Sequence, residues 1–244
     1  MNYQPDIRVL NTPQELFQAA AAEFVGLAEQ AIHTSGRFTV ALSGGSTPRS
    51  LYALLASEVI PTLRWEKIYF FFSDERYVPA DAPESNYRMA YEALLSKVPI
   101  PKENIFPVPT DAGSAEAAAS SYEGTLRSFF KLKAGEFPRF DLILLGMGPD
   151  GHTASLFPGT AALEENQRLV VANWVEKFKT YRITFTLPVL NNAATVVFLV
   201  SGQEKAAMVC KVLRDGQDLP ARRVQPTNGR LIWMLDRAAA CELK

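Results

Sequence analysis

A histidine in a glycine-rich segment is the first residue of this sequence that could perform acid–base chemistry. The segment Gly146–His152 (GMGPDGH) follows an apolar run, Asp141–Leu145. An imidazole titrates near neutral pH, so His152 can take a proton from a water molecule. Asp150 can orient the ring or contact the hydroxyl groups of a substrate. The alternative is a structural loop histidine, with Asp150 capping the next helix.

A second glycine-rich segment, Ser43–Pro48 (SGGSTP), lies between a predicted strand, Arg37–Leu42, and a predicted helix that starts at Pro48. Glycines let the backbone approach an anion, and a helix N-terminus presents unpaired N–H groups. The segment has neither the Gly-Lys-Ser/Thr ending of a Walker A loop nor the spacing of a dinucleotide fingerprint. It predicts an anion site or, alternatively, an ordinary turn. The candidate anion-binding residues are Gly44, Gly45, Ser46 and Thr47.

Three further cations are candidates for binding an anion. Arg76, in the Asp74–Arg76 segment after the predicted strand Ile68–Phe72, has a planar fork of donors that suits a phosphate or a developing oxyanion. A surface charge cluster is the competing interpretation. Lys205, near the start of a predicted helix, either reaches the anion or is solvated. Arg182 begins a predicted strand and either lies near the site or pairs with an acid.

Serine nucleophiles and metal ions are not favoured by the sequence. Ser43 and Ser46 do not lie in a GxSxG motif, and one histidine would have to serve every step. The other histidine, His33, falls inside a predicted amphipathic helix, and the two cysteines, Cys210 and Cys241, form no cluster with a histidine. We therefore expect neither a metal site nor a cofactor.

The elements that position these residues alternate between strands and helices. Helical periodicity predicts helices at about 13–34, from Pro48, at about 86–95, 114–132 and 204–213. Apolar runs predict strands at 37–42, 68–72, 141–145, 182–187, 195–200 and 231–235. Continuous apolar strands of this kind form mostly parallel α/β sheets with helices on both faces, and ligands bind beyond their carboxyl ends. We expect one domain over residues 1–244, with a small lobe or insertion possible around 104–140.

Composition limits the classes of function. The chain has 244 residues, 48% hydrophobic, and its 25 basic and 26 acidic residues leave a net charge of -1. This balance does not favour a nucleic-acid surface. No apolar stretch reaches the roughly 20 residues that cross a bilayer, and scarce cysteines are typical of a reducing compartment. The sequence therefore predicts a cytoplasmic protein, a monomer or small homo-oligomer, without nucleic-acid or membrane partners.

Several of these motifs, in this order and spacing, resemble the 6-phosphogluconolactonase family. The matching segments are ALSGGSTPRSLY, FFSDERYVPADAPESNYRMA, DLILLGMGPDGHTASLFPGT, RITFTLPVLNNA, VVFLVSGQEKAAMV and, more weakly, GRLIWMLDRAAA. The resemblance covers most of the chain from about residue 37. It implies a modified Rossmann-like fold related to glucosamine-6-phosphate deaminases and ribose-5-phosphate isomerases.

The resemblance also implies an activity: hydrolysis of 6-phospho-D-glucono-1,5-lactone to 6-phospho-D-gluconate in the oxidative pentose phosphate pathway. His152 would be the general base that activates water, with Asp150 as its partner. The Gly44–Thr47 loop would hold the 6-phosphate, and Arg76 and Lys205 would supply charge. Arg76 could instead stabilise the oxyanion, and the role of Arg182 stays open.

Two other functions compete with a lactonase. Aldose–ketose isomerases and deaminases, such as the glucosamine-6-phosphate deaminases, resemble this chain in the phosphate loop and the Asp-Gly-His motif, but they typically carry an acid shortly after the histidine, in an Asn-Glu-Pro context. The segment Thr153–Pro158 (TASLFP) contains no acid. A sugar-phosphate sensor would need the anion loop without the base, and the presence of both Asp150 and His152 favours an enzyme.

Overall fold

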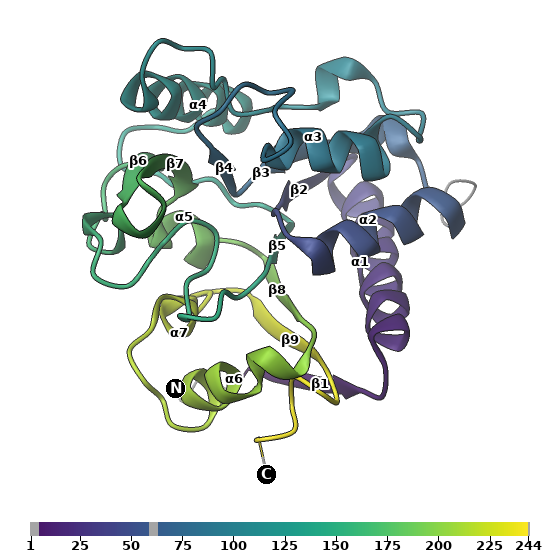
Figure 1. The fold of residues 1–244 in the computed structure, drawn as a ribbon. Helices are drawn as coiled ribbons and strands as arrows, with labels where there is room; N and C mark the ends of the chain where they lie inside the picture. The colour runs from purple at the N-terminus through teal and green to yellow at the C-terminus, as the bar shows by residue number, and fades with distance from the viewer. Residues whose placement is uncertain (1–4, 59–62, 244) are drawn as a thin grey trace.

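Two sheets organise the computed structural model, which describes residues 5–58 and 63–243 (Figure 1). The larger sheet has six strands, and every neighbouring pair in it is parallel. Its order is β1 (Asp6–Leu10), β9 (Arg230–Asp236), β8 (Thr195–Val200), β5 (Leu142–Leu145), β2 (Phe38–Leu42) and β3 (Ile68–Phe72). The predicted parallel α/β sheet is confirmed.

Helices flank this sheet, as Figure 1 shows. Two of them, α1 (Pro13–Ser35) and α2 (Ser46–Glu58), lie on its right in that view, while α6 (Ala206–Leu213) and α7 (Pro220–Arg223) lie on its left. The remaining helices are α3 (Asn86–Ala90), which continues into a π-helical turn at Tyr91–Leu95, α4 (Ala115–Phe130) and α5 (Leu187–Asn191). Covered on both sides, strands β2, β5 and β8 are buried at every position, which explains their unbroken apolar sequences.

The first helix begins where its capping signal predicts. The Thr12 side chain accepts a hydrogen bond from the Glu15 N–H, and Pro13 occupies the first turn. The Glu15 carboxylate accepts from the backbone N–H of Asn11, one residue before the cap. These bonds satisfy backbone donors that a helix N-terminus otherwise leaves free.

A second, antiparallel sheet was not expected. It has the order β4 (Asp74–Arg76), β7 (Thr180–Phe185) and β6 (Val170–Val175). The strand predicted at 182–187 therefore belongs to this smaller sheet, and Asp74–Arg76 is a strand rather than a loop. In β4 the first two side chains are buried although all three are charged, so hydrophobic patterning could not reveal it.

Residues 104–140 share the hydrophobic core of the rest of the chain. Helix α4 packs on β6 and β7, and its buried face includes Ala118, Tyr122 and Leu126. The Tyr122 hydroxyl accepts a hydrogen bond from the Phe72 N–H in β3 at 2.8 Å. The division into domains stays a prediction, and this shared core supports a single unit.

No helix in the described ranges is long and apolar enough to cross a membrane.

Candidate active site

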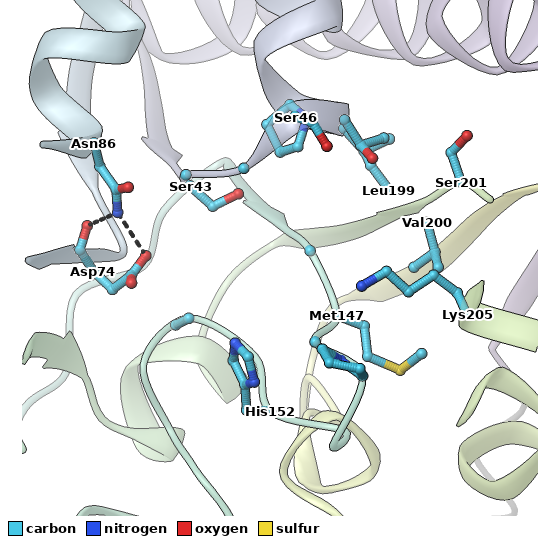
Figure 2. Close-up of a pocket in the computed structure, with 18 of the residues that line it drawn as sticks. Ser43, Ser46, Asp74, Asn86, Met147, His152, Leu199, Val200, Ser201 and Lys205 are labelled. Atoms are coloured by element: carbon cyan, nitrogen blue, oxygen red, sulfur yellow. Dashed lines mark hydrogen bonds between the residues drawn. The ribbon is translucent and has the colours of Figure 1, made fainter. Parts of the chain in front are cut away.

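A cavity of about 270 Å³ opens at the carboxyl ends of β2, β5 and β8 (Figure 2). Each of these strands runs directly into a segment that lines it, as expected for a parallel sheet. Strand β4 of the second sheet contributes another wall. The lining residues are Ser43–Pro48, Asp74, Arg76, Asn86, Gly146–Pro149, His152, Ala154, Leu199–Ser201 and Lys205.

The glycine-rich segment after β2 forms one wall of this cavity. Helix α2 begins at Ser46 rather than at the predicted Pro48, so Ser46 and Thr47 belong to its first turn. Their position places the N-terminal end of the helix dipole at the cavity. Gly44, Gly45, Ser46 and Thr47 all line it, so the four residues predicted to bind an anion lie together.

His152 stands on the opposite wall and is held from several directions. Its Nδ1 atom hydrogen-bonds to the Asp150 carboxylate, and its ring stacks on Phe157, with centroids 4.1 Å and planes 26° apart. Because Nδ1 is occupied by Asp150, the lone pair of the neutral ring resides on Nε2. The imidazole is about one-quarter exposed, with a side-chain accessibility of 23%.

Gly148 allows the imidazole to lie where it does. A Cβ atom at this position would stand 2.0 Å from Cε1 and 2.1 Å from Nδ1 of His152, well inside van der Waals contact. The Gly148 N–H also donates to the His152 carbonyl at 2.8 Å, which closes the loop. A side chain at residue 148 would therefore displace the ring.

Asp150 does not line the cavity, but it contacts His152, which does. Burial would raise the pKa of the Asp150 carboxyl, yet the hydrogen bond and charge of His152 outweigh it and hold that pKa below its ordinary value. Asp150 is therefore a carboxylate at neutral pH. Lys177 lies farther out, with its Nζ 3.8 Å from the second carboxylate oxygen.

Two cations face the cavity. Arg76 reaches it from β4 and donates through Nη1 to the Glu84 carbonyl. Lys205 ends a short 3₁₀ turn, Gln203–Lys205, and in Figure 2 its ammonium group points toward the centre of the cavity. No ion pair in the described part of the chain includes Lys205. Its positive charge is available to an anion.

Arg182 lies outside the group of cavity-lining residues. It faces Arg76 in the register of β7 and β4, and its guanidinium stands over the ring of Phe178 at 5.5 Å. Burial and then the charge of Arg76 lower the pKa of Arg182. Arg182 therefore lies beside the strand that carries Arg76 and outside the set of cavity-lining residues.

Buried polar residues around the histidine loop were not predicted. Asp74 accepts a hydrogen bond from the Ser155 hydroxyl at 2.6 Å and another from the Asn86 amide at 3.3 Å. The Ser155 N–H donates to the Thr184 hydroxyl, and Asn173 donates to the Ser155 carbonyl. Every strand of the second sheet thus bonds to Ser155, three residues after His152. This sheet anchors the loop that carries the histidine.

Glu75 organises the wall that holds Asn86. Its carboxylate accepts hydrogen bonds from the backbone N–H groups of Arg76, Asn86 and Tyr87 and from the Ser85 hydroxyl. It caps the start of α3 from inside the protein. Asp74 and Glu75 are 6% and 2% exposed, so the segment is not the surface charge cluster that was the competing interpretation.

No group of three or more His, Cys, Asp or Glu side chains suited to a metal ion occurs among residues 5–58 and 63–243.

Comparison with known proteins agrees with this geometry. Residues 11–233 match the family described as glucosamine-6-phosphate isomerases/6-phosphogluconolactonase. The chain belongs to this family. A 6-phosphogluconolactonase from Synechocystis sp. is 46% identical over 243 residues, which cover 98% of this chain and 99% of that protein.

Solved structures show the same similarity. The 6-phosphogluconolactonase from Trypanosoma cruzi superimposes with a TM-score of 0.90 at 34% identity, covering 100% of this chain and 98% of that one. A monomeric glucosamine-6-phosphate deaminase gives a TM-score of 0.81 over 97% of this chain and 99% of that one, at 22% identity. At that identity the second likeness concerns the fold alone, and it confirms the expected relationship to the fold of glucosamine-6-phosphate deaminases.

Proposed function

We propose that this family member is a 6-phosphogluconolactonase, which hydrolyses 6-phospho-D-glucono-1,5-lactone to 6-phospho-D-gluconate in the oxidative pentose phosphate pathway. The observation that carries the proposal is the juxtaposition of a tethered imidazole with an anion site. His152, bonded to Asp150, lines the same cavity as the Gly44–Thr47 loop and Lys205. A phosphorylated sugar lactone has the two groups that such a cavity serves: an anion to hold and a carbonyl to attack.

The phosphate group is assigned to the helix end of the cavity. Backbone N–H groups at Gly44 and Gly45, the hydroxyls of Ser46 and Thr47, and the ammonium of Lys205 supply donors and positive charge there. Binding the distant phosphate fixes the position of the lactone carbon relative to His152. Positioning of this kind converts a bimolecular attack into one between held partners.

The chemical step needs one base. Nε2 of His152 takes a proton from water as the oxygen attacks C1 of the lactone, which gives a tetrahedral oxyanion. The bond between C1 and the ring oxygen then breaks, and the imidazolium returns its proton to that oxygen. Asp150 stabilises the imidazolium that exists between these steps. Arg76 lines the same cavity at the wall formed by β4, where its guanidinium can serve either the oxyanion or the phosphate.

The environment of His152 favours hydrolysis over deamination. Phe157, which is 6% exposed, covers one face of the imidazole in the TASLFP segment, where deaminases carry an acid. This segment gives the imidazole an apolar contact and contains no carboxylate. A sensor would need the anion site without a base, whereas this cavity has His152 hydrogen-bonded to Asp150. The arrangement therefore favours an enzyme.

A cytoplasmic location and a monomeric or small homo-oligomeric state belong to the same proposal. Cys210 and Cys241 form no disulfide with each other, which is compatible with a reducing compartment. Size-exclusion chromatography with light scattering measures the oligomeric state directly.

The proposed function is tested by following acid release from 6-phospho-D-glucono-1,5-lactone, generated enzymatically in the assay, with the spontaneous rate subtracted. Glucosamine-6-phosphate is assayed in parallel for ammonia. Acid release above the spontaneous rate without ammonia supports the lactonase. Ammonia release shifts the assignment to a deaminase, and folded protein that binds 6-phosphogluconate without turnover shifts it to a sensor.

A further inference from the structure

A buried carboxylate outside the cavity is connected to Lys205. Asp236 is the last residue of β9 and is 1% exposed. It does not line the cavity, and nothing in the sequence motifs singled it out. A buried carboxylate is costly unless donors surround it, so its contacts indicate what it stabilises.

The donors to Asp236 come mainly from the segment after β8. The Ser201 hydroxyl donates to Oδ2 at 2.5 Å, and the Gly202 N–H lies 3.1 and 3.2 Å from the two carboxylate oxygens. A third donor, the Ala239 N–H, reaches Oδ1 at 2.7 Å. Asp236 therefore fixes the Ser201–Gly202 turn, and Ser201 itself lines the cavity.

The same turn is bonded to the backbone of Lys205. The Lys205 N–H donates to the Gly202 carbonyl at 3.1 Å, so one residue links the carboxylate to the lysine. Gly202 has φ 104° and ψ 143°, a conformation that residues with a side chain rarely adopt. A glycine can adopt many other backbone conformations, and the hydrogen bonds to the Asp236 carboxylate hold Gly202 in this one.

We propose that Asp236 is a positioning residue for Lys205: by holding the Ser201–Gly202 turn, it sets where the ammonium group meets the 6-phosphate of the substrate. The inference rests on the proposed function. It assigns Asp236 a part in phosphate binding without contact with the substrate. Loss of the carboxylate then weakens binding of phosphorylated ligands in particular and leaves the His152 machinery in place.

Asp236→Asn in the full chain is the test. Asparagine keeps the volume, but its NH₂ group cannot accept a hydrogen bond, so either Ala239 or the Ser201–Gly202 turn loses an acceptor, and the negative charge that both share is removed. We expect a rise of about three- to tenfold in KM for 6-phospho-D-glucono-1,5-lactone. The kcat/KM for unphosphorylated glucono-1,5-lactone should change by less than about twofold, since its hydrolysis does not use Lys205.

A double-mutant comparison separates positioning from a general structural effect. Lys205→Met removes the ammonium group, so Asp236→Asn added to it should raise KM no further. An equal rise in both backgrounds, or equal losses of kcat/KM for the two lactones, would overturn the proposal. If Asp236→Asn does not fold, Gly202→Ala replaces it in the same comparison, because Gly202 does not line the cavity and a side chain at its φ of 104° strains the same turn.

Failure of the proposed function gives a different result. A wild-type chain without lactonase activity refutes that function, yet Asp236 can still be tested by calorimetric titration with 6-phosphogluconate and gluconate. The role of Asp236 is supported if Asp236→Asn weakens the binding of 6-phosphogluconate but not that of gluconate, and if this effect disappears in the Lys205→Met background. Unchanged binding of both compounds refutes it.

Discussion

The ring of Phe157 stacks on the imidazole of His152, so the candidate base has an apolar face on one side and the Asp150 carboxylate at its edge. The two contacts act differently. The carboxylate selects the tautomer whose Nε2 lone pair is free, and the phenyl ring restricts rotation of the imidazole. Together they hold the imidazole of His152, the proposed base, in one orientation at the cavity wall.

Removing this base should abolish most turnover without abolishing binding. For His152→Ala we expect kcat to fall about 100- to 10,000-fold, the range that a positioned general base contributes. The dissociation constant of 6-phosphogluconate, measured by calorimetry, should change by less than about threefold, because the proposed phosphate site is on another wall of the cavity. Unchanged turnover would remove His152 from its proposed role.

Gly148→Ala should lower activity by moving the same ring. The added methyl group would stand about 2 Å from the imidazole, so either His152 or the loop must shift. Gly146→Ala is the matched comparison in the same loop, since a Cβ there meets nothing within 4 Å. We expect kcat/KM to fall at least about tenfold more for Gly148→Ala than for Gly146→Ala, as small misplacements of reacting groups are costly. Similar losses in the two variants would contradict this account.

Lys205→Met should reduce the preference for a phosphorylated substrate. A hydrogen bond to a charged group contributes about 1.5–3 kcal/mol, so KM for the phosphorylated lactone should rise about 10- to 100-fold. The measured quantity is the ratio of kcat/KM for 6-phospho-D-glucono-1,5-lactone to that for glucono-1,5-lactone. A ratio equal to that of the wild type would place the phosphate elsewhere.

Glu75 should make the fold less stable as the pH rises through its titration range. Burial raises the pKa of this carboxyl, and the backbone N–H groups of Asn86, Tyr87 and Arg76 offset it only in part. The folded state thus binds the proton more tightly than the unfolded state. Deprotonation therefore lowers the free energy of unfolding in the window from the ordinary glutamate pKa up to the raised value.

Glu75→Gln tests this pH dependence. The variant should be less stable than the wild type at low pH, because the amide NH₂ faces donors that need an acceptor. It should also lack the decrease in unfolding free energy across that window, measured by urea denaturation at a series of pH values. Parallel pH profiles for the two proteins would show that Glu75 does not titrate there.

Much of the larger sheet could be predicted because its strands are apolar throughout. The predicted bounds of β3 and β8 coincide with the observed ones, Ile68–Phe72 and Thr195–Val200. The short β1 escaped prediction because it is an edge strand with mostly exposed side chains. Of the second sheet, only β7 was predicted as a strand, and β6 (Val170–Val175) was missed. Strand β4 is only Asp74–Arg76, and tertiary hydrogen bonding, rather than hydrophobic periodicity, makes it a strand.

The candidate site was predictable where its residues follow one another in a motif. Gly44–Thr47 and Asp150–His152 each form a local pattern, and the topology of a parallel sheet predicts that they meet. The contacts of Ser155 with Asp74, Thr184 and Asn173 join separate strands, so no local pattern contains them. The contacts of Asp236 could not be predicted for the same reason, since two of its donors, Ser201 and Gly202, lie in the loop after β8.

The pairing of β1 with β9 bears on the order in which a growing chain can acquire its parts on the ribosome. In the observed register Asp6 lies beside Ile232 and Leu10 lies beside Asp236. Strand β1 is therefore synthesised first but has no neighbouring strand until β9 has been synthesised. The same late segment delivers the carboxylate that holds the Ser201–Gly202 turn. A nascent chain that has released β6 and β7 but not β9 therefore has the residues that anchor the histidine loop before it has the carboxylate that holds the Ser201–Gly202 turn.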